Sequence, residues 1–198
     1  MVLAMLFAWA SIPAFAQAPG TQAPAIDAAL LAKANAGDAA AQIEIGDLYA
    51  RAAAAPSQDP NSRAAAALSA SDYRQAAGWY RKAAEQGSVT GELRLAALYR
   101  DGSGVARDMA QAAEWYRKAA EQGDAGAQAT LGVLYSMGQG VPHSDVEAYY
   151  WLDLAASVKG PDQVKYAANR QMIGTHITAD ELADVEGRVA NWLAAHPR

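Results

Sequence analysis

Apolar side chains between residues 124 and 137 recur at the spacing of one face of an α-helix. The stripe, at positions i, i+4, i+7 and i+8, consists of Ala127, Leu131, Leu134 and Tyr135. Asp124 stands just before it, where a short acidic side chain caps free backbone N–H groups. Gly138 and Gly140 follow it, and glycine adopts the positive φ angles of a sharp turn without steric cost. The segment therefore predicts an amphipathic helix that ends in a glycine turn.

A second helix is predicted directly after this turn. Ser144 and Glu147 have the spacing of a capping box, in which each side chain binds the backbone N–H of the other residue. Gly160 and Pro161 then end the helix, because proline cannot continue it. Two helices joined by a short turn run antiparallel, so residues 124–160 predict a helical hairpin.

The same hairpin pattern occurs three times. Residues 76–87 read AAGWYRKAAEQG and residues 112–123 read AAEWYRKAAEQG, 36 residues apart. A looser copy follows at the same spacing, around Trp151. The first copy carries 14 extra residues, since Tyr49 precedes Tyr99 by 50 residues. Repeats of this length indicate a solenoid, in which each unit buries its apolar face against the next.

These patterns predict an all-α protein, an α-solenoid of antiparallel helix pairs with capping helices at both ends. In the insertion at 52–70 we expect a proline-interrupted loop with a short helix at 64–68. Thr178 and Glu181 predict another capping box. The expected boundaries are a repeat domain at 27–198, a leading helix at 27–36, repeats at about 37–87, 88–123 and 124–160, and capping helices at 163–172 and 180–195 within 161–198.

The repeated motifs resemble the Sel1-like repeat, a relative of the tetratricopeptide repeat. The resemblance rests on L-Y in the first helix, G-x-G-V in the turn and W-Y-x-K-A-A-E-Q-G in the second helix. It covers Gly37 to Gly160, and the second copy is closest to the pattern. The first copy lacks G-x-G-V, and the third has Leu152 where the others have tyrosine. The resemblance implies an α-solenoid that acts as an adaptor between proteins.

Composition and charge narrow the possible partners. About a quarter of the residues are alanine, which favours helices that pack closely. A net charge of -5 without any Lys/Arg run argues against nucleic acid and anionic membranes as partners. The chain has no cysteine, which excludes disulfides, thiolate metal sites and a cysteine nucleophile.

The first 16 residues resemble a secretory signal peptide. They are uncharged, and Ser11 is their only polar side chain. Pro13 interrupts the apolar run, and Ala14 and Ala16 form the small-x-small pattern of a cleavage site. We expect cleavage after Ala16, a flexible leader at 17–26, and a secreted or periplasmic protein without stable membrane insertion. The positive charge that usually precedes the apolar run is missing, which points to a start further upstream. An uncleaved signal anchor and an apolar terminus on a cytosolic protein are the alternatives.

No catalytic, cofactor or metal site is predicted. His143, His176 and His196 share no metal-ligand spacing, so we interpret them as surface residues. The chain contains no G-x-S-x-G, S-x-x-K, G-x-G-x-x-G or P-loop pattern, and the G-x-G pairs recur as repeat turns. The repeated tryptophans are either a ligand-stacking ladder or core residues, and their regular recurrence favours the core. They are Trp79, Trp115 and Trp151.

Protein binding on the concave surface remains as the candidate function. In solenoids of this class the first helix of each pair lines the concave side. Positions three and four residues off the apolar stripe are expected to face a partner. They are Glu44, Asp47, Arg51, Arg94, Ala97, Asp101, Thr130, Val133 and Met137. The set is charged in the first repeat and apolar in the third, which suits an extended segment with a basic or mixed-charge head and an apolar tail.

We therefore predict a secreted or periplasmic adaptor that binds another protein or a peptide segment and is not an enzyme. The resemblance implies roles in envelope signalling, exopolysaccharide regulation or secretion in a bacterium. A β-lactamase-like or other periplasmic hydrolase is the enzymatic alternative, because some cysteine-rich Sel1-like proteins are linked to β-lactams. This chain lacks those cysteines. A purely structural assembly module is the third alternative.

Overall fold

A computed structural model describes residues 24–55 and 63–197 of the chain, so the predicted signal peptide at 1–16 lies outside the described residues. The described part contains helices and no strands. None of these helices combines the length and the apolar character needed to span a bilayer. The helices are α1 (Ala28–Asn35), α2 (Ala39–Ala54), α3 (Arg63–Glu85), α4 (Val89–Asp101), α5 (Met109–Glu121), α6 (Ala125–Met137), α7 (Asp145–Ala156), α8 (Gln163–Gly174) and α9 (Ala179–Ala195).

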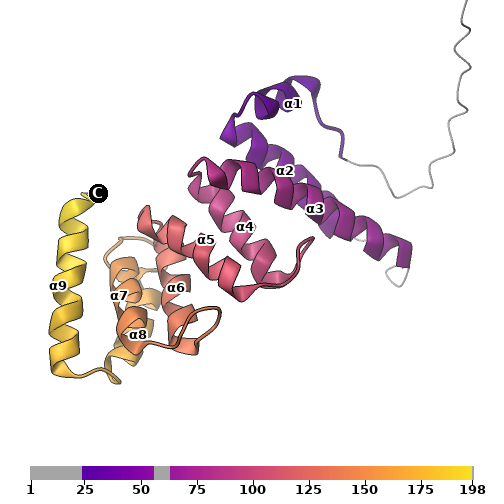
Figure 1. Ribbon diagram of the computed structural model, residues 1–198. Helices are drawn as coiled ribbons and strands as arrows, with labels where there is room; N and C mark the ends of the chain where they lie inside the picture. The colour runs from indigo at the N-terminus through magenta and orange to yellow at the C-terminus, as the bar shows by residue number, and fades with distance from the viewer. Residues whose placement is uncertain (1–23, 56–62, 198) are drawn as a thin grey trace, which may run out of the picture.

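Consecutive helices form packed pairs, which stack in chain order. α2 packs on α3, α4 on α5, and α6 on α7, while α3 also contacts α4, and α5 contacts α6. Figure 1 shows the pairs following one another along a curved row from α1 to α9. Nearly every helix–helix contact therefore joins neighbours in the sequence, as in a solenoid. The predicted all-α solenoid is confirmed.

Polar side chains start the helices where the sequence predicted. Thr178 and Glu181 form the reciprocal capping box of α9. Ser144 accepts a hydrogen bond from the backbone N–H of Glu147, as expected at the start of α7. The Glu147 carboxylate pairs with Arg188 of α9 at 2.8 Å. The predicted capping box of α7 is therefore only half formed: Ser144 caps the helix, while the glutamate connects α7 to α9.

The G-x-G turns are contacts between repeats. Gly104 and Gly140 have φ angles of 70° and 72°, which disfavour any residue with a side chain. A Cβ atom on Gly104 would overlap the backbone of Tyr73 in α3, and one on Gly140 would overlap the backbone of Met109 in α5. Each turn therefore packs against the second helix of the preceding repeat, which explains why the glycines recur.

The insertion in the first repeat lengthens two helices. α2 continues three residues past the point that corresponds to the end of α4, and α3 begins ten residues before the point that corresponds to the start of α5. Residues 64–68 are helical as predicted, but they are the first turns of α3 and not a separate short helix, and residues 52–54 continue α2 where a loop was expected. Residues 63–77 contain neither glycine nor proline, and their alanines favour a continuous helix.

Small residues let the two helices of a pair approach closely. Gly46 of α2 faces Tyr80 of α3, and a Cβ atom on this glycine would lie 2.5 Å from the tyrosine ring. Gly132 of α6 faces Leu152 of α7, where a Cβ atom would lie 2.7 Å from the leucine side chain. Ala96 takes the equivalent position in α4 and is fully buried.

The repeated tryptophans differ in burial. Trp151 is 6% exposed and belongs to the core, as predicted. Trp79 and Trp115 are only half-buried, and a lysine three residues further on lies over each ring, at 3.9 and 3.8 Å. The tyrosines that follow them, Tyr80 and Tyr116, are the buried aromatic side chains of α3 and α5. The prediction of core tryptophans therefore holds fully for the third repeat alone.

A column of buried polar side chains runs through the first helices. Its members are Gln42, Glu92 and Gln128. Each glutamine Nε2 donates to a backbone carbonyl eight residues upstream, at 3.0 and 3.1 Å. Glu92 is 2% exposed, and its Oε2 accepts a hydrogen bond of 2.9 Å from Gln122. Burial raises the pKa of Glu92, against the lowering effects of Lys118 and Gln122.

Candidate protein-binding grooves

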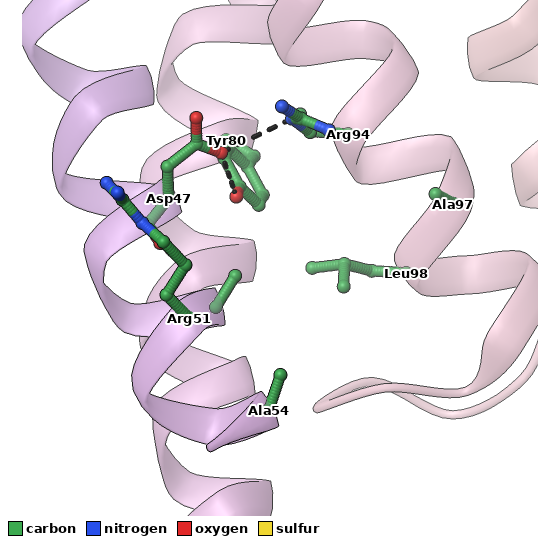
Figure 2. A pocket seen from close by; sticks show the side chains of 8 residues that line it. Asp47, Arg51, Ala54, Tyr80, Arg94, Ala97 and Leu98 are labelled. Atoms are coloured by element: carbon green, nitrogen blue, oxygen red, sulfur yellow. Dashed lines mark hydrogen bonds and ion pairs between the residues drawn. The ribbon is translucent and has the colours of Figure 1, made fainter.

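A groove of about 490 Å³ lies between α2 and α4, the first helices of the first two repeats. Figure 2 shows the side chains that line it. One end of the groove is polar and surrounds Tyr80, whose side chain projects from α3. The other end is apolar and contains Ala54 and Leu98. The lining residues are Asp47, Ala50, Arg51, Ala54, Tyr80, Arg94, Ala97 and Leu98.

Asp47 is the centre of the polar end. The Tyr80 hydroxyl donates a hydrogen bond of 2.6 Å to its Oδ1, and Nε of Arg94 lies 3.3 Å from the same oxygen. Burial, together with the hydrogen bond to this carboxylate, raises the pKa of Tyr80 well above its usual range. The phenol therefore remains a neutral donor at physiological pH. Asp47 is thus matched by a hydrogen-bond donor and a guanidinium within the protein.

Arg51 lies one helical turn after Asp47 on α2. Its Nε donates to the backbone carbonyl of Asp47 at 3.1 Å. The terminal nitrogens of the guanidinium take no part in this hydrogen bond. Arg51 is exposed, and it forms no ion pair within residues 24–55 and 63–197. The groove therefore offers one unmatched positive charge beside an apolar floor.

A second, smaller groove lies between α6 and α8. Its volume is about 300 Å³, and its α6 side carries Thr130 and Val133. Tyr166 and Lys165 line the α8 side. This groove occupies the place between successive first helices that the α2–α4 groove occupies in the first two repeats. The face formed by first helices is therefore hollowed at both ends of the array.

The predicted partner-binding residues divide into three groups. Asp47, Arg51, Arg94 and Ala97 line the first groove, and Thr130 and Val133 line the second. The remaining three line neither groove and are Glu44, Asp101 and Met137. Asp101 is engaged by its neighbour Arg100 through two hydrogen bonds, at 2.8 and 3.0 Å.

Tyr80 was not predicted to line a groove, because only first helices were expected to face a partner. The signal was present in the repeat pattern, since Tyr80 is an aromatic residue on the second helix of the repeat that carries Gly46. That glycine leaves room for the tyrosine to reach the α2–α4 groove.

The histidines are exposed, as predicted, but two of them contact the same carboxylate. His143 and His176 lie 3.5 and 3.4 Å from the two carboxylate oxygens of Asp145. His196 stacks on Trp192, with ring centroids 4.1 Å apart. Across the described ranges, no group of three or more potential ligands is arranged to hold a metal ion.

Helix hairpins stacked in chain order, with grooves between successive first helices, define a helical-repeat scaffold. The chain contains three Sel1 repeats: the family model described as Sel1 repeat matches residues 63–88, 90–124 and 125–157. Sel1-repeat proteins generally mediate protein–protein interaction, and their fold is typically a non-catalytic scaffold.

Two solved structures are similar to this chain. One is a protective antigen present in uropathogenic Escherichia coli strains and displaying an SLR fold, with 27% identity, a TM-score of 0.58, and coverage of 83% of this chain and 40% of that one. The other is a Sel1 repeat protein from Oxalobacter formigenes, with 31% identity, a TM-score of 0.58, and coverage of 73% and 52%. This chain therefore spans about half or less of each of these proteins. No curated protein matches the sequence significantly.

Proposed function

We propose that this chain is an exported adaptor that binds an extended segment of another protein in the α2–α4 groove. The observation that carries the proposal is the unmatched guanidinium of Arg51 beside the apolar residues Ala54 and Leu98. A segment with a carboxylate and a neighbouring apolar side chain complements both features. The basic head suggested by the sequence pattern fits less well, because Asp47 is already paired with Arg94.

Site-specific crosslinking tests this placement. The chain has no cysteine, so Ala97→Cys introduces a unique thiol in the groove for a photoreactive label. Ala110→Cys is the matched control, because Ala110 is exposed on the second helix α5. We expect a discrete adduct from an envelope extract with the Ala97 label and none with the Ala110 label. The captured peptide should contain an acidic residue. Equal adducts at both sites would contradict the proposal.

Arg51→Glu tests the charge. Reversal should weaken partner capture about tenfold or more, since it places a like charge against the partner's carboxylate. High salt should narrow the difference. Arg74→Glu is the matched control: Arg74 is also exposed and makes the same hydrogen bond to the carbonyl four residues before it, but it does not line the groove. If both variants lose the partner equally, net charge rather than the groove controls binding.

Export is part of the proposal and has its own test. The small-x-small pattern at Ala14 and Ala16 supports removal of residues 1–16. Mass spectrometry of the protein from its native cells should find Gln17 at the N-terminus. Full-length protein confined to the cytosol would refute export and leave the groove assignment intact. Within the envelope, we place the adaptor in signalling, exopolysaccharide regulation or secretion, and the captured partner distinguishes these roles.

A further inference from the structure

Asp47 and Arg51 of α2 are spaced as an i,i+4 pair of opposite charges, but their side chains form no ion pair. Such pairs usually meet on the surface of a helix, and the order with the acid first is the favourable one. Glu114 and Lys118 of α5 are an example in this chain, with charged atoms 3.8 Å apart. Arg51 instead donates to the backbone carbonyl of Asp47. The Asp47 carboxylate is therefore held away from the cation one turn later on its own helix.

The residues that hold this carboxylate come from α3 and α4. The Tyr80 hydroxyl donates to its Oδ1 at 2.6 Å, and Nε of Arg94 lies 3.3 Å from the same oxygen. Figure 2 shows the carboxylate directed toward these two groups, with the Arg51 guanidinium on the other side of the Asp47 side chain. The contacts between helices therefore replace the pair that α2 would form by itself.

The positive charge of Arg51 still acts at this end of the groove. Burial and the contact with Asp47 raise the pKa of Tyr80, while the charges of Arg94 and Arg51 lower it. Both guanidiniums thus lie near enough to the phenol to influence it. Because the net effect is a raised pKa, the hydroxyl keeps its proton in the neutral range and continues to donate it to Asp47.

The repeat fold does not require a hydroxyl at position 80. In the second repeat the equivalent hydroxyl, of Tyr116, accepts a hydrogen bond from an arginine of α4, and Ala97 replaces the aspartate. In the third repeat Leu152 takes the position of the tyrosine and is 1% exposed, so the helix pair packs there without a polar group. The contact between Tyr80 and Asp47 is therefore a feature of the α2–α4 groove and not of the repeat.

We propose that Tyr80 is a positioning residue: with Arg94 it holds the Asp47 carboxylate away from Arg51, which keeps the Arg51 guanidinium available to a carboxylate of the partner segment. The inference rests on the function proposed for the α2–α4 groove. Without the hydroxyl, Asp47 is freer to turn toward Arg51 and form the i,i+4 pair. That internal pair competes with the partner, because only the unpaired fraction of Arg51 is ready to bind.

Chemical labelling of arginine measures the availability of Arg51 without any partner. Phenylglyoxal condenses with guanidinium groups, and pairing with a carboxylate slows the reaction. In Tyr80→Phe we expect the labelling rate of Arg51 to fall about twofold, the scale of a surface i,i+4 ion pair. Mass spectrometry of peptic fragments measures this rate. Adding Asp47→Asn to Tyr80→Phe should restore the rate, because the competing charge is gone, whereas a merely structural role of the hydroxyl predicts no such rescue.

Arg74 is the internal control for labelling. It is exposed and makes the same backbone hydrogen bond as Arg51 but does not line the groove, so its rate should be equal in all variants. Arg94→Gln removes the other contact with Asp47 and should also slow Arg51, so this variant decides the question if Tyr80→Phe impairs folding. The proposal is overturned if Arg51 reacts at the wild-type rate in folded Tyr80→Phe, or if the double variant remains slow.

Partner capture separates this inference from the proposed function. If labelling follows the expected order but the photoreactive label at Ala97 captures no partner, the groove assignment fails and the positioning of Asp47 by Tyr80 stands. If the Ala97 label captures the same partner equally well in wild type and in Tyr80→Phe, the groove assignment stands and the positioning role is refuted.

Discussion

At position 92 the second repeat differs from its neighbours, and the difference places a titratable carboxyl group in the core. Gln42 and Gln128 satisfy the carbonyl eight residues upstream with an amide N–H. An ionised Glu92 has no proton to donate to the equivalent carbonyl of Ala84. Protonation would supply that donor, which agrees with the raised pKa of the buried carboxyl. The buried Glu92 carboxylate therefore destabilises the fold at neutral pH, and the glutamines at the equivalent positions of the other repeats do not.

We expect Glu92→Gln to stabilise the protein at pH 7 by about 1 kcal/mol, the usual net value of one hydrogen bond. Because burial raises the pKa of Glu92, its cost to folding is absent at low pH, where the group is protonated in both states. The cost appears as pH rises through the raised pKa. Urea unfolding at pH 7 and pH 4 measures this, and the gain should shrink at pH 4. The mirror variant Gln42→Glu should lose stability at pH 7. A gain that is the same at both pH values would contradict this account.

The apolar stripe predicted four of the eight residues that line the α2–α4 groove. These are Asp47, Arg51, Arg94 and Ala97. Their side chains project from first helices at regular offsets, so the helical period alone placed them. Tyr80 could not be placed this way, since its entry into the groove depends on the depth of contact between α2 and α3. The pairing of Asp47 with Arg94 is likewise a contact between repeats, which periodicity within one helix does not encode.

At the scale of the elements, local signals predicted helix starts and turns, but they did not predict helix lengths around the insertion. Caps and glycine turns depend on one or two residues each, so they can be predicted from the local sequence. The insertion combines two prolines with two alanine runs, and these signals compete. Helix propensity prevails on both sides, because α2 and α3 already supply the nucleus that an isolated alanine run lacks.

We expect Gly140→Ala to destabilise the protein by roughly 1–3 kcal/mol, the range for a non-glycine residue held at positive φ, with the overlap onto Met109 adding to it. Gly78→Ala is the matched control. Gly78 lies within α3, and a Cβ atom there would meet nothing within 4 Å, so this change should stabilise by about 1 kcal/mol through helix propensity. Thermal unfolding of both variants measures the contrast. Two variants of equal stability would show that the turn does not constrain the repeat.

At the scale of the whole molecule, stability is distributed unevenly along the array. The third repeat has the densest core, since eight of the twelve residues of α7 are buried. By contrast, α8 has no buried residue, and α9 buries only Val185 and Val189. In a solenoid each unit is stabilised mainly by its neighbours, so the end with a one-sided contact opens most easily. The sequence predicted two closing helices here, but their separation from each other is a property of tertiary packing.

Hydrogen exchange should therefore be faster in α8 than in α6. Its amides are protected by its own helical hydrogen bonds and by one packed neighbour, α7, whereas α6 packs against both α5 and α7. We expect the amides of α8 to exchange at least about tenfold faster than those of α6, since local opening of α8 exposes no fully buried side chain of its own. Mass spectrometry of peptic fragments resolves the two helices, and α7 serves as the internal reference. Equal protection of α6 and α8 in the free protein would contradict this picture, because α8 would then be as firmly held as a helix inside the array.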